Sequence, residues 1–207
     1  MTAACASTTA VVGGLSDIVR GSVRREIYYL PGMGGRLDRG LGHGLLERGY
    51  SLMGRETVGD FKRLRFGDQV EAVKSDLLGR FWHPDGLVIA NSYGGYLFLH
   101  AQLDLDAFPG RVLLLSPVIG QATHERLGVR FFHPRADVLG KVSLEGGFPR
   151  LANIEVHVGE EDWQAGPQAL LDFCVALEIR VHVARGRGHT LGIDYVGPVL
   201  DQWLLKM

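Results

Sequence analysis

The chain has 207 residues, which is long enough for one domain with a sizeable core and short for two. Hydrophobic residues make up 46% and charged residues 22%, a balance that excludes disordered and fibrous classes. Lysine and arginine total 22 against 23 aspartates and glutamates, so the formal net charge is -1 and nucleic acid is not an expected partner.

The first 25 residues form a Gly/Ser/Thr-rich lead that we expect to be flexible. This lead lacks a basic start, and Ser7, Thr8 and Thr9 interrupt its apolar run, so it is a poor signal peptide. No run of about 18 apolar residues occurs, so no membrane span is expected. The two cysteines, Cys5 and Cys174, suit a reducing compartment, and the predicted location is the cytoplasm.

From residue 26 onward, short β-rich runs alternate with longer amphipathic helical runs. This alternation predicts an α/β fold with a three-layer, doubly wound, mostly parallel sheet of about six strands, in a single domain over residues 26–207. The predicted strands are 26–30, 50–58, 86–90, 111–115, 154–158 and 180–184, and the predicted helices are 37–48, 68–81, 96–105, 168–177 and 195–205. Asp68 is the expected N-cap of the second helix.

Residues 116–149 form the longest segment without clear periodicity. Loops beyond about 15 residues inside a compact domain are usually functional or carry small elements of their own. Phe131, Phe132 and His133 make this segment aromatic enough to line a pocket, and equally able to pack it down on the domain. We therefore predict a short lid or cap at 116–149.

The predicted strand at 86–90 runs into a helix through a tight turn centred on Ser92. Ala90 and Gly94 flank the serine, which gives the pattern small-x-Ser-x-small. Close packing of strand and helix requires small residues at these positions, and the turn lifts the serine hydroxyl above the sheet. The alternative is that Ser92 only caps the next helix, since serine is a favoured N-cap.

This turn resembles the nucleophile elbow of the α/β-hydrolase family, Gly-x-Ser-x-Gly, with Ala90 in place of the first glycine. The resemblance covers roughly residues 26 to 207 and implies the architecture of that family with a minimal cap. It also implies Ser92 as the nucleophile and the backbone N–H of Tyr93 as one donor of an oxyanion hole.

The loop after the first strand, Pro31-Gly-Met-Gly-Gly35, is similar to the His-Gly-x-Gly segment of the same family, with Pro31 in place of the histidine. The resemblance implies the N–H of Met33 as the second oxyanion donor, with Gly32 and Gly34 close to the substrate. The alternative is a nucleotide-phosphate loop, but the glycine spacing misses G-x-G-x-x-G and no G-K-[ST] follows.

A serine nucleophile needs a base, and His189 lies in a glycine-rich loop between the last strand and the final helix, where the family keeps its catalytic histidine. Asp162, three residues after Gly159, matches the family's Gly-x-x-Asp pattern, and its implied role is to orient the imidazole. Glu160 and Glu161 are rivals for that role, and a further alternative is that all three acidic residues only solvate a loop.

The remaining histidines point to no metal site. His157 and His182 alternate within strands and are interpreted as packing or sheet-face residues, and the others lack a partner at metal-ligand spacing: His43, His83, His100, His124 and His133. No metal and no cofactor are therefore expected.

The resemblance implies a serine hydrolase of the carboxylesterase kind, acting on the ester, thioester or amide bond of a small-molecule acyl substrate. Val118 and Trp163 are further expected substrate-binding residues. Two alternatives stay open, because a fold does not fix a function. One is the same triad used for acyl transfer, carbon–carbon bond hydrolysis or lyase chemistry, and the other is a binding protein without catalysis.

Overall fold

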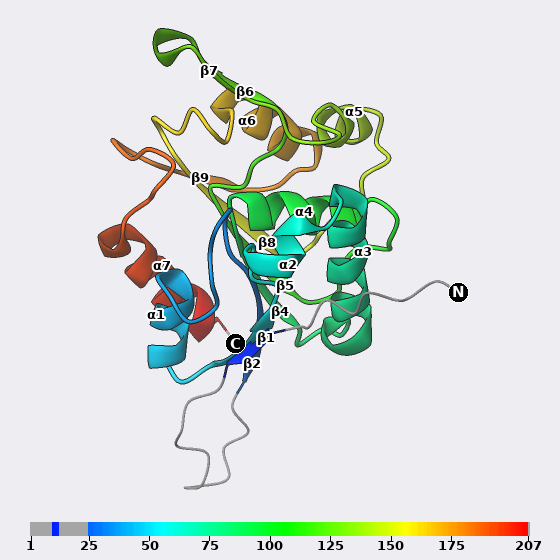
Figure 1. Ribbon diagram of the computed structural model, residues 1–207, viewed down its shortest axis with the longest axis vertical. Coiled ribbons are helices and arrows are strands. Elements are labelled where there is room, and N and C mark those ends of the chain that lie inside the picture. The colour runs from blue at the N-terminus through cyan, green and yellow to red at the C-terminus, as the bar shows by residue number, and fades with distance from the viewer. Residues whose placement is uncertain (1–9, 13–24, 207) are drawn as a thin grey trace, which may run out of the picture.

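The computed structural model describes residues 10–12 and 25–206 (Figure 1). The expected flexibility of the N-terminal lead therefore falls mostly on residues outside this range. No helix in the described ranges is long and apolar enough to cross a membrane.

A seven-stranded sheet runs through the centre of the molecule in the order β1-β3-β2-β4-β5-β8-β9 (Figure 1). Its strands are β1 (Ala10–Val12), β2 (Glu26–Leu30), β3 (Ser51–Gly54), β4 (Leu87–Asn91), β5 (Arg111–Leu115), β8 (Ile154–Gly159) and β9 (Val181–Ala184). β1 pairs antiparallel with β3, and the other six strands run parallel to one another. The predicted mostly parallel sheet is confirmed, and β1 is an addition at its edge.

Helices connect the strands and begin close to the predicted positions. They are α1 (Leu41–Glu47), α2 (Gly59–Arg63), α3 (Phe66–Asp76), a π-helical turn η1 (Leu77–Phe81), α4 (Tyr93–Gln102), α5 (Val138–Leu144), α6 (Pro167–Ala176) and α7 (Ile193–Leu205). The expected cap of α3 was wrong. Arg65 is the N-cap residue. Asp68 lies in the first turn, where its negative carboxylate interacts favourably with the positive end of the helix dipole.

Two hydrophobic clusters on opposite faces of the sheet create the three layers. Tyr28 and Leu30 of β2 pack into the cluster that includes residues of α3, α4 and α6. Ile27 and Tyr29 alternate with them and pack into the cluster that includes residues of α1 and α7. Because successive side chains of a strand point to opposite faces, both faces of the central strands are apolar and buried.

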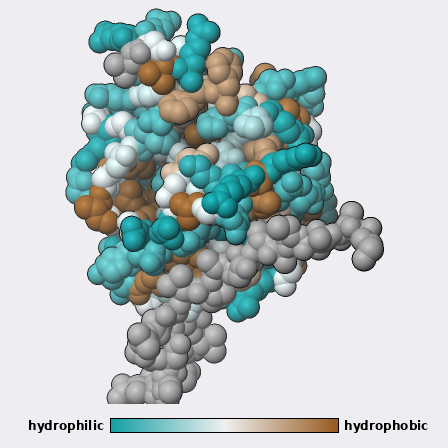
Figure 2. Space-filling model, viewed as in Figure 1, coloured by the Kyte–Doolittle hydropathy of each residue, from teal (hydrophilic) through white to brown (hydrophobic). Residues whose placement is uncertain are grey.

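Residues 116–149 contain small elements of their own. A hairpin of β6 (Ala122–His124) and β7 (Val129–Phe131), joined by a 3-10 turn η2 (Glu125–Leu127), projects at the top of Figure 1, and α5 contacts α6 beside it. The face in Figure 2 is largely hydrophilic, with hydrophobic residues scattered over it. Phe132, just after the hairpin, is 67% exposed.

Candidate active site

The turn between β4 and α4 holds Ser92 in an unusual backbone conformation. Its φ of 51° and ψ of -115° lie outside the regions that non-glycine residues normally occupy, a strain that costs about 1–3 kcal/mol and persists only where the surroundings enforce it. Ser92 occupies the N-cap position of α4, yet its side chain makes no capping hydrogen bond. The Ser92 side chain therefore does not act as the cap of α4.

Glycines after the turn allow the start of α4 to approach its neighbours. A Cβ built on Gly94 would lie 2.1 Å from the carbonyl oxygen of Leu30, and one built on Gly95 would lie 2.8 Å from Cβ of Pro117. Both distances are shorter than real Cβ contacts allow. The small residues near the serine are thus required by the closeness of α4 to the segments that follow β2 and β5.

Three side chains that are distant in sequence form a hydrogen-bonded line above the sheet. Ser92 Oγ lies 2.7 Å from His189 Nε2. On the other side of the ring, His189 Nδ1 lies 2.9 Å from Asp162 Oδ1 and 3.1 Å from Oδ2. Each residue follows the carboxyl end of a parallel strand, β4, β9 or β8, which is where open α/β sheets bring loops together.

The Asp162 carboxylate is completely buried and held from two sides. Its Oδ1 accepts hydrogen bonds from the backbone N–H groups of Gln164 (3.1 Å) and Ala165 (3.0 Å) as well as facing the imidazole. Glu160, a rival for this position, instead accepts a hydrogen bond from the N–H of Gly186 at 2.9 Å. Its carboxylate ties the loop after β8 to the loop that carries His189.

The loop after β2 lies directly against the nucleophile. A Cβ on Gly32 would sit 3.2 Å from Cβ of Ser92. Thr57 fixes this loop, because its hydroxyl accepts a hydrogen bond from the N–H of Gly35 at 3.0 Å and donates one to the carbonyl of Gly32. The sequence patterns gave no indication of Thr57, which is buried and reaches the loop from the segment after β3.

Two backbone N–H groups beside Ser92 have no partner in the described part of the chain. None of the described residues accepts a hydrogen bond from the N–H of Met33. Tyr93 is the first residue of α4, and the first N–H groups of a helix have no acceptor within the helix. Tyr93 directly follows the serine in the chain, and Met33 lines the same pocket as the serine.

Comparisons with known proteins place this architecture. No family model and no curated protein sequence matches the chain. Several solved structures match it. A monoacylglycerol lipase of Paleococcus ferrophilus superposes with a TM-score of 0.66 at 11% identity, covering 97% of this chain and 99% of that one. An esterase of Exiguobacterium antarcticum gives 0.64 at 11% identity, with 96% and 94% covered.

A third similar structure is alpha/beta hydrolase domain-containing protein 10 from mouse, with a TM-score of 0.61 at 13% identity over 97% of this chain and 99% of that one. The chain has the α/β-hydrolase fold. Pro31 and Ala90, where the sequence departs from the motifs of that family, are both buried.

In this α/β-hydrolase fold, Ser92 and His189 line a pocket of about 620 Å³. The apolar part of its lining consists of Met33, Leu41, Leu115, Leu191, Ile193 and Val196. Residues 190–196, which follow His189 directly, supply much of this wall, and the sequence patterns missed them as well as Leu41. Their only sequence signal is their position next to the expected base.

Of the four residues expected to bind substrate, only Gly32 lines this pocket. Gly34 is exposed at a φ of 79°, and Val118 is buried with its N–H donating to the carbonyl of Ser92 at 3.3 Å. Trp163 stacks on Phe131 of the β6–β7 hairpin, with ring centroids 5.5 Å apart. Trp163 therefore contacts the expected lid segment and does not line the pocket.

Two tyrosines at the start of α4 connect the site to its surroundings. The hydroxyl of Tyr93 donates to Gln69 Oε1 at 2.6 Å, and burial raises the pKa of Tyr93 to about 12. The hydroxyl of Tyr96 donates to the carbonyl of Pro134 at 2.7 Å, which ties residues 116–149 to α4. Within the described residues, the one group of side chains suited to hold a metal, Glu155, His157 and His182, does not line this pocket.

Proposed function

We propose that the chain is a serine hydrolase that cleaves an ester, thioester or amide bond through an acyl-enzyme intermediate. The observation that carries the proposal is the hydrogen-bonded line Ser92–His189–Asp162, which opens into a pocket. The α/β-hydrolase fold supports it, since similar structures include a lipase and an esterase.

The geometry supports the following sequence of steps. His189 Nε2, 2.7 Å from the Ser92 hydroxyl, accepts its proton while Oγ attacks the substrate carbonyl carbon. The tetrahedral intermediate then expels the alcohol, thiol or amine, which takes the proton from His189. Water, deprotonated by the same imidazole, attacks the acyl-enzyme and releases the acid and the free serine hydroxyl. Asp162 holds the ring orientation and stabilises the imidazolium.

The oxygen of the tetrahedral intermediate carries negative charge, and the N–H groups of Met33 and Tyr93 are its proposed hydrogen-bond donors. Their support is that both are unpartnered within the described residues and adjoin the elbow. Each donor of this kind lowers a barrier by about 3 kcal/mol in enzymes where it has been removed.

The pocket favours a substrate with an uncharged, apolar acyl or alcohol group. Its volume of about 620 Å³ lies within the range of small-molecule sites, and leucine, isoleucine and valine side chains form much of its wall. The part of the wall formed by residues 190–196 adjoins His189, so a bound apolar group would lie next to the base.

We further propose that residues 116–149 act as the lid of this single domain over residues 26–207. Two contacts support that role: the stacking of Phe131 on Trp163, and the hydrogen bond from Tyr96 to the carbonyl of Pro134. The first contact reaches the residue after Asp162 and the second reaches the helix that follows Ser92.

The Ser92→Ala variant tests the proposal on a panel of short p-nitrophenyl esters. Removing the nucleophile should lower kcat/KM by about 10⁴-fold or more while the melting temperature stays near that of the parent. Ser116→Ala is the matched control, since Ser116 is also a serine at positive φ, directly after β5, but is fully buried and does not line the pocket. Equal hydrolysis by the parent and Ser92→Ala would exclude the assignment.

A further inference from the structure

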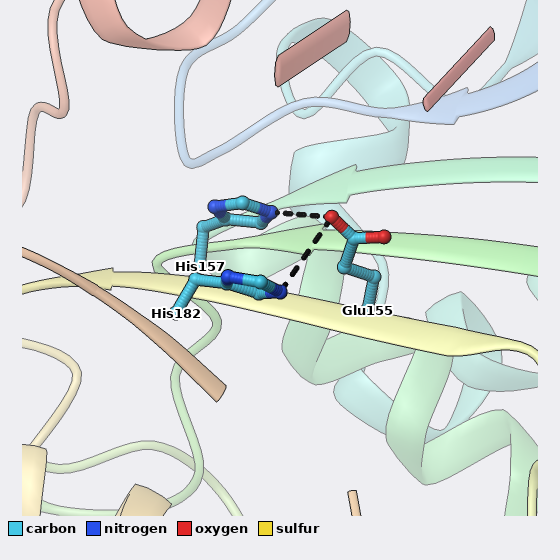
Figure 3. Close-up of side chains that lie close together, drawn as sticks. All are labelled: Glu155, His157 and His182. Carbon is cyan, nitrogen blue, oxygen red and sulfur yellow. Dashed lines mark hydrogen bonds and ion pairs between the residues drawn. The ribbon is translucent and has the colours of Figure 1, made fainter. Parts of the chain in front are cut away.

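Three metal-ligating side chains gather on one face of β8 and β9, outside the pocket described above (Figure 3). Glu155 and His157 are two residues apart on β8, so both point to the same face of the sheet. His182 of β9 pairs in register with His157, which places it on that face as well. Parallel pairing thus brings together two histidines that are 25 positions apart in the printed sequence.

The three donor atoms converge. Glu155 Oε1 lies 3.0 Å from His157 Nε2 and 3.8 Å from His182 Nε2, and all three atoms lie within 4.8 Å of one another. The imidazole rings stack with centroids 4.5 Å apart at 10°, so their Nε2 atoms point to the same oxygen (Figure 3). Ligand atoms about 2.0–2.2 Å from a tetrahedral zinc ion stand about 3.3–3.6 Å from one another, a spacing that lies between the two Glu155–histidine distances.

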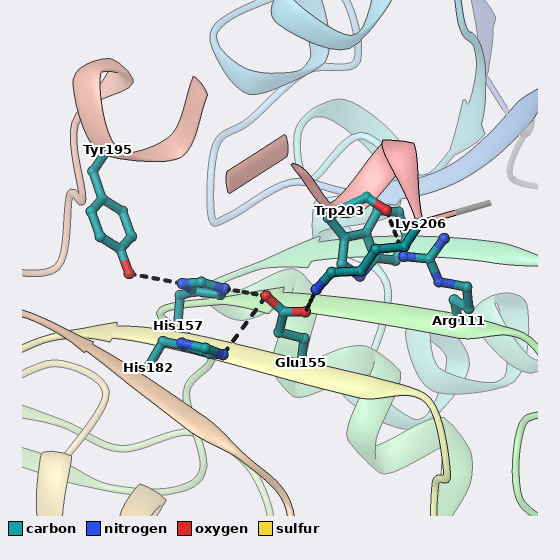
Figure 4. Close-up of polar contacts among 7 residues, drawn as sticks. All are labelled: Arg111, Glu155, His157, His182, Tyr195, Trp203 and Lys206. Carbon is teal, nitrogen blue, oxygen red and sulfur yellow. Dashed lines mark hydrogen bonds and ion pairs between the residues drawn. The ribbon is translucent and has the colours of Figure 1, made fainter. Parts of the chain in front are cut away.

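Neighbouring side chains form hydrogen bonds with two of these three side chains (Figure 4). The other ring nitrogen of His157, Nδ1, is 2.8 Å from the hydroxyl of Tyr195, and Lys206 donates to the second oxygen of Glu155 at 2.9 Å. Histidine ligands of metals nearly always engage their second ring nitrogen in this way, which fixes the ring and leaves Nε2 for the ion.

We propose that Glu155, His157 and His182 bind one zinc ion. The site has a route to solvent, because the side chains of Glu155 and His182 are 21% and 31% exposed while that of His157 is 5% exposed. Three protein ligands leave a coordination position for water. The sequence patterns assign both histidines to strand packing, since the pairing that joins them is not visible along the chain.

The ion would act as a clamp. It would link the edge strand β9 to β8, and Tyr195 in the first turn of α7 and Lys206 just after its end would couple the clamp to that helix. Zinc that binds only the folded chain stabilises it by mass action.

The direct test is a zinc titration of the full chain, first stripped with a chelator and then measured in competition with a chromogenic zinc indicator. One zinc should bind per chain. His182→Gln and Glu155→Gln should each weaken binding by at least about 100-fold, since loss of a supporting partner alone typically costs 10–100-fold.

Two variants serve as controls. His43→Gln removes an exposed histidine that faces Glu47 at 3.3 Å, and Cys5→Ser removes a thiol outside the described residues. Neither should change zinc affinity. Absence of zinc uptake by the parent chain, or one-to-one binding that survives both His182→Gln and Glu155→Gln, would overturn the proposal.

Thermal unfolding supplies a second readout. At free zinc about 100-fold above its dissociation constant, the folding equilibrium constant should rise about 100-fold, which raises Tm by about 5–10 °C for a chain of this size. The shift should fall to about 2 °C or less in His182→Gln and persist in Ser92→Ala. A shift of equal size in His182→Gln would contradict the site.

Discussion

At the scale of single residues, two substitutions of Asp162 distinguish its role in orienting His189 from its role in accepting hydrogen bonds from the backbone. In Asp162→Asn, an amide oxygen at the Oδ1 position can still accept from the N–H groups of Gln164 and Ala165. The amide nitrogen then takes the Oδ2 position, 3.1 Å from His189 Nδ1, where it presents a donor, and the negative charge is lost. The imidazole is then driven into the wrong tautomer. We expect kcat to fall by about 10³–10⁴-fold on an ester substrate with little change in Tm.

Asp162→Ala is the matched comparison, because it also leaves the N–H groups of Gln164 and Ala165 without their acceptor. That variant should lose stability by about 1–3 kcal/mol in addition to activity, measured by urea unfolding. A kcat in Asp162→Asn within tenfold of the parent would show that this carboxylate does not orient the base.

The residues of the hydrogen-bonded line could be predicted because their types and order are constrained by chemistry. A serine between small residues, a histidine in a glycine loop and an aspartate after a strand are each visible locally. Thr57 and Leu41 could not be predicted, because they reach the site through contacts between distant segments and carry no local pattern. The same holds for the pairing of His157 with His182.

At the scale of elements, the closeness of α4 to the end of β2 makes Gly94 a sensitive position. Gly94→Ala places Cβ 2.1 Å from a backbone oxygen, which cannot move away without shifting the sheet. We expect a loss of about 3 kcal/mol or more in the free energy of unfolding, from chemical denaturation. Gly79→Ala is the control, because a Cβ at this exposed position meets nothing within 4 Å and should be neutral or slightly stabilising.

Equal stability of the two glycine variants would contradict the tight packing at the elbow.

Strands with a strong local pattern were predicted well, and elements without one were not. β2 and β5 have the predicted bounds, because each is a continuous apolar run bounded by turn residues. β1 and α2 were missed, since neither shows a local hydrophobic pattern and both depend on tertiary pairing or packing. α4 begins at Tyr93, before the predicted start at residue 96. Gly94 and Gly95 are poor helix formers, so the sequence pattern places the start after them, whereas packing requires both glycines within the helix.

At the scale of the whole molecule, His100 links stability to pH. It is fully buried among the rings of Phe66 and Tyr96, and neither of its ring nitrogens has a hydrogen-bond partner among the described residues. Burial, with a contribution from Arg135, lowers the pKa of His100 to about 4. Its unfolded form has a pKa near 6.5, so between these values the unfolded chain binds the proton and the folded chain does not.

Stability should therefore be fully present above about pH 6.5 and fall as the pH drops toward 4, with His100 contributing on the order of 3 kcal/mol to the loss. His100→Leu removes this proton site. The variant should lose less unfolding free energy than the parent between pH 7 and 4.5, measured by urea denaturation at each pH. Parallel pH profiles for the two chains would refute the assignment.

The proposed function requires that Ser92 is a nucleophile activated by His189. A fluorophosphonate reacts covalently with such a serine, so digestion of the labelled chain followed by mass spectrometry locates the modified side chain. We expect one phosphonyl adduct per chain, on the peptide that contains Ser92, formed far more slowly in His189→Ala. An adduct at another residue, or ester hydrolysis by a chain whose Ser92 remains unmodified, would contradict it.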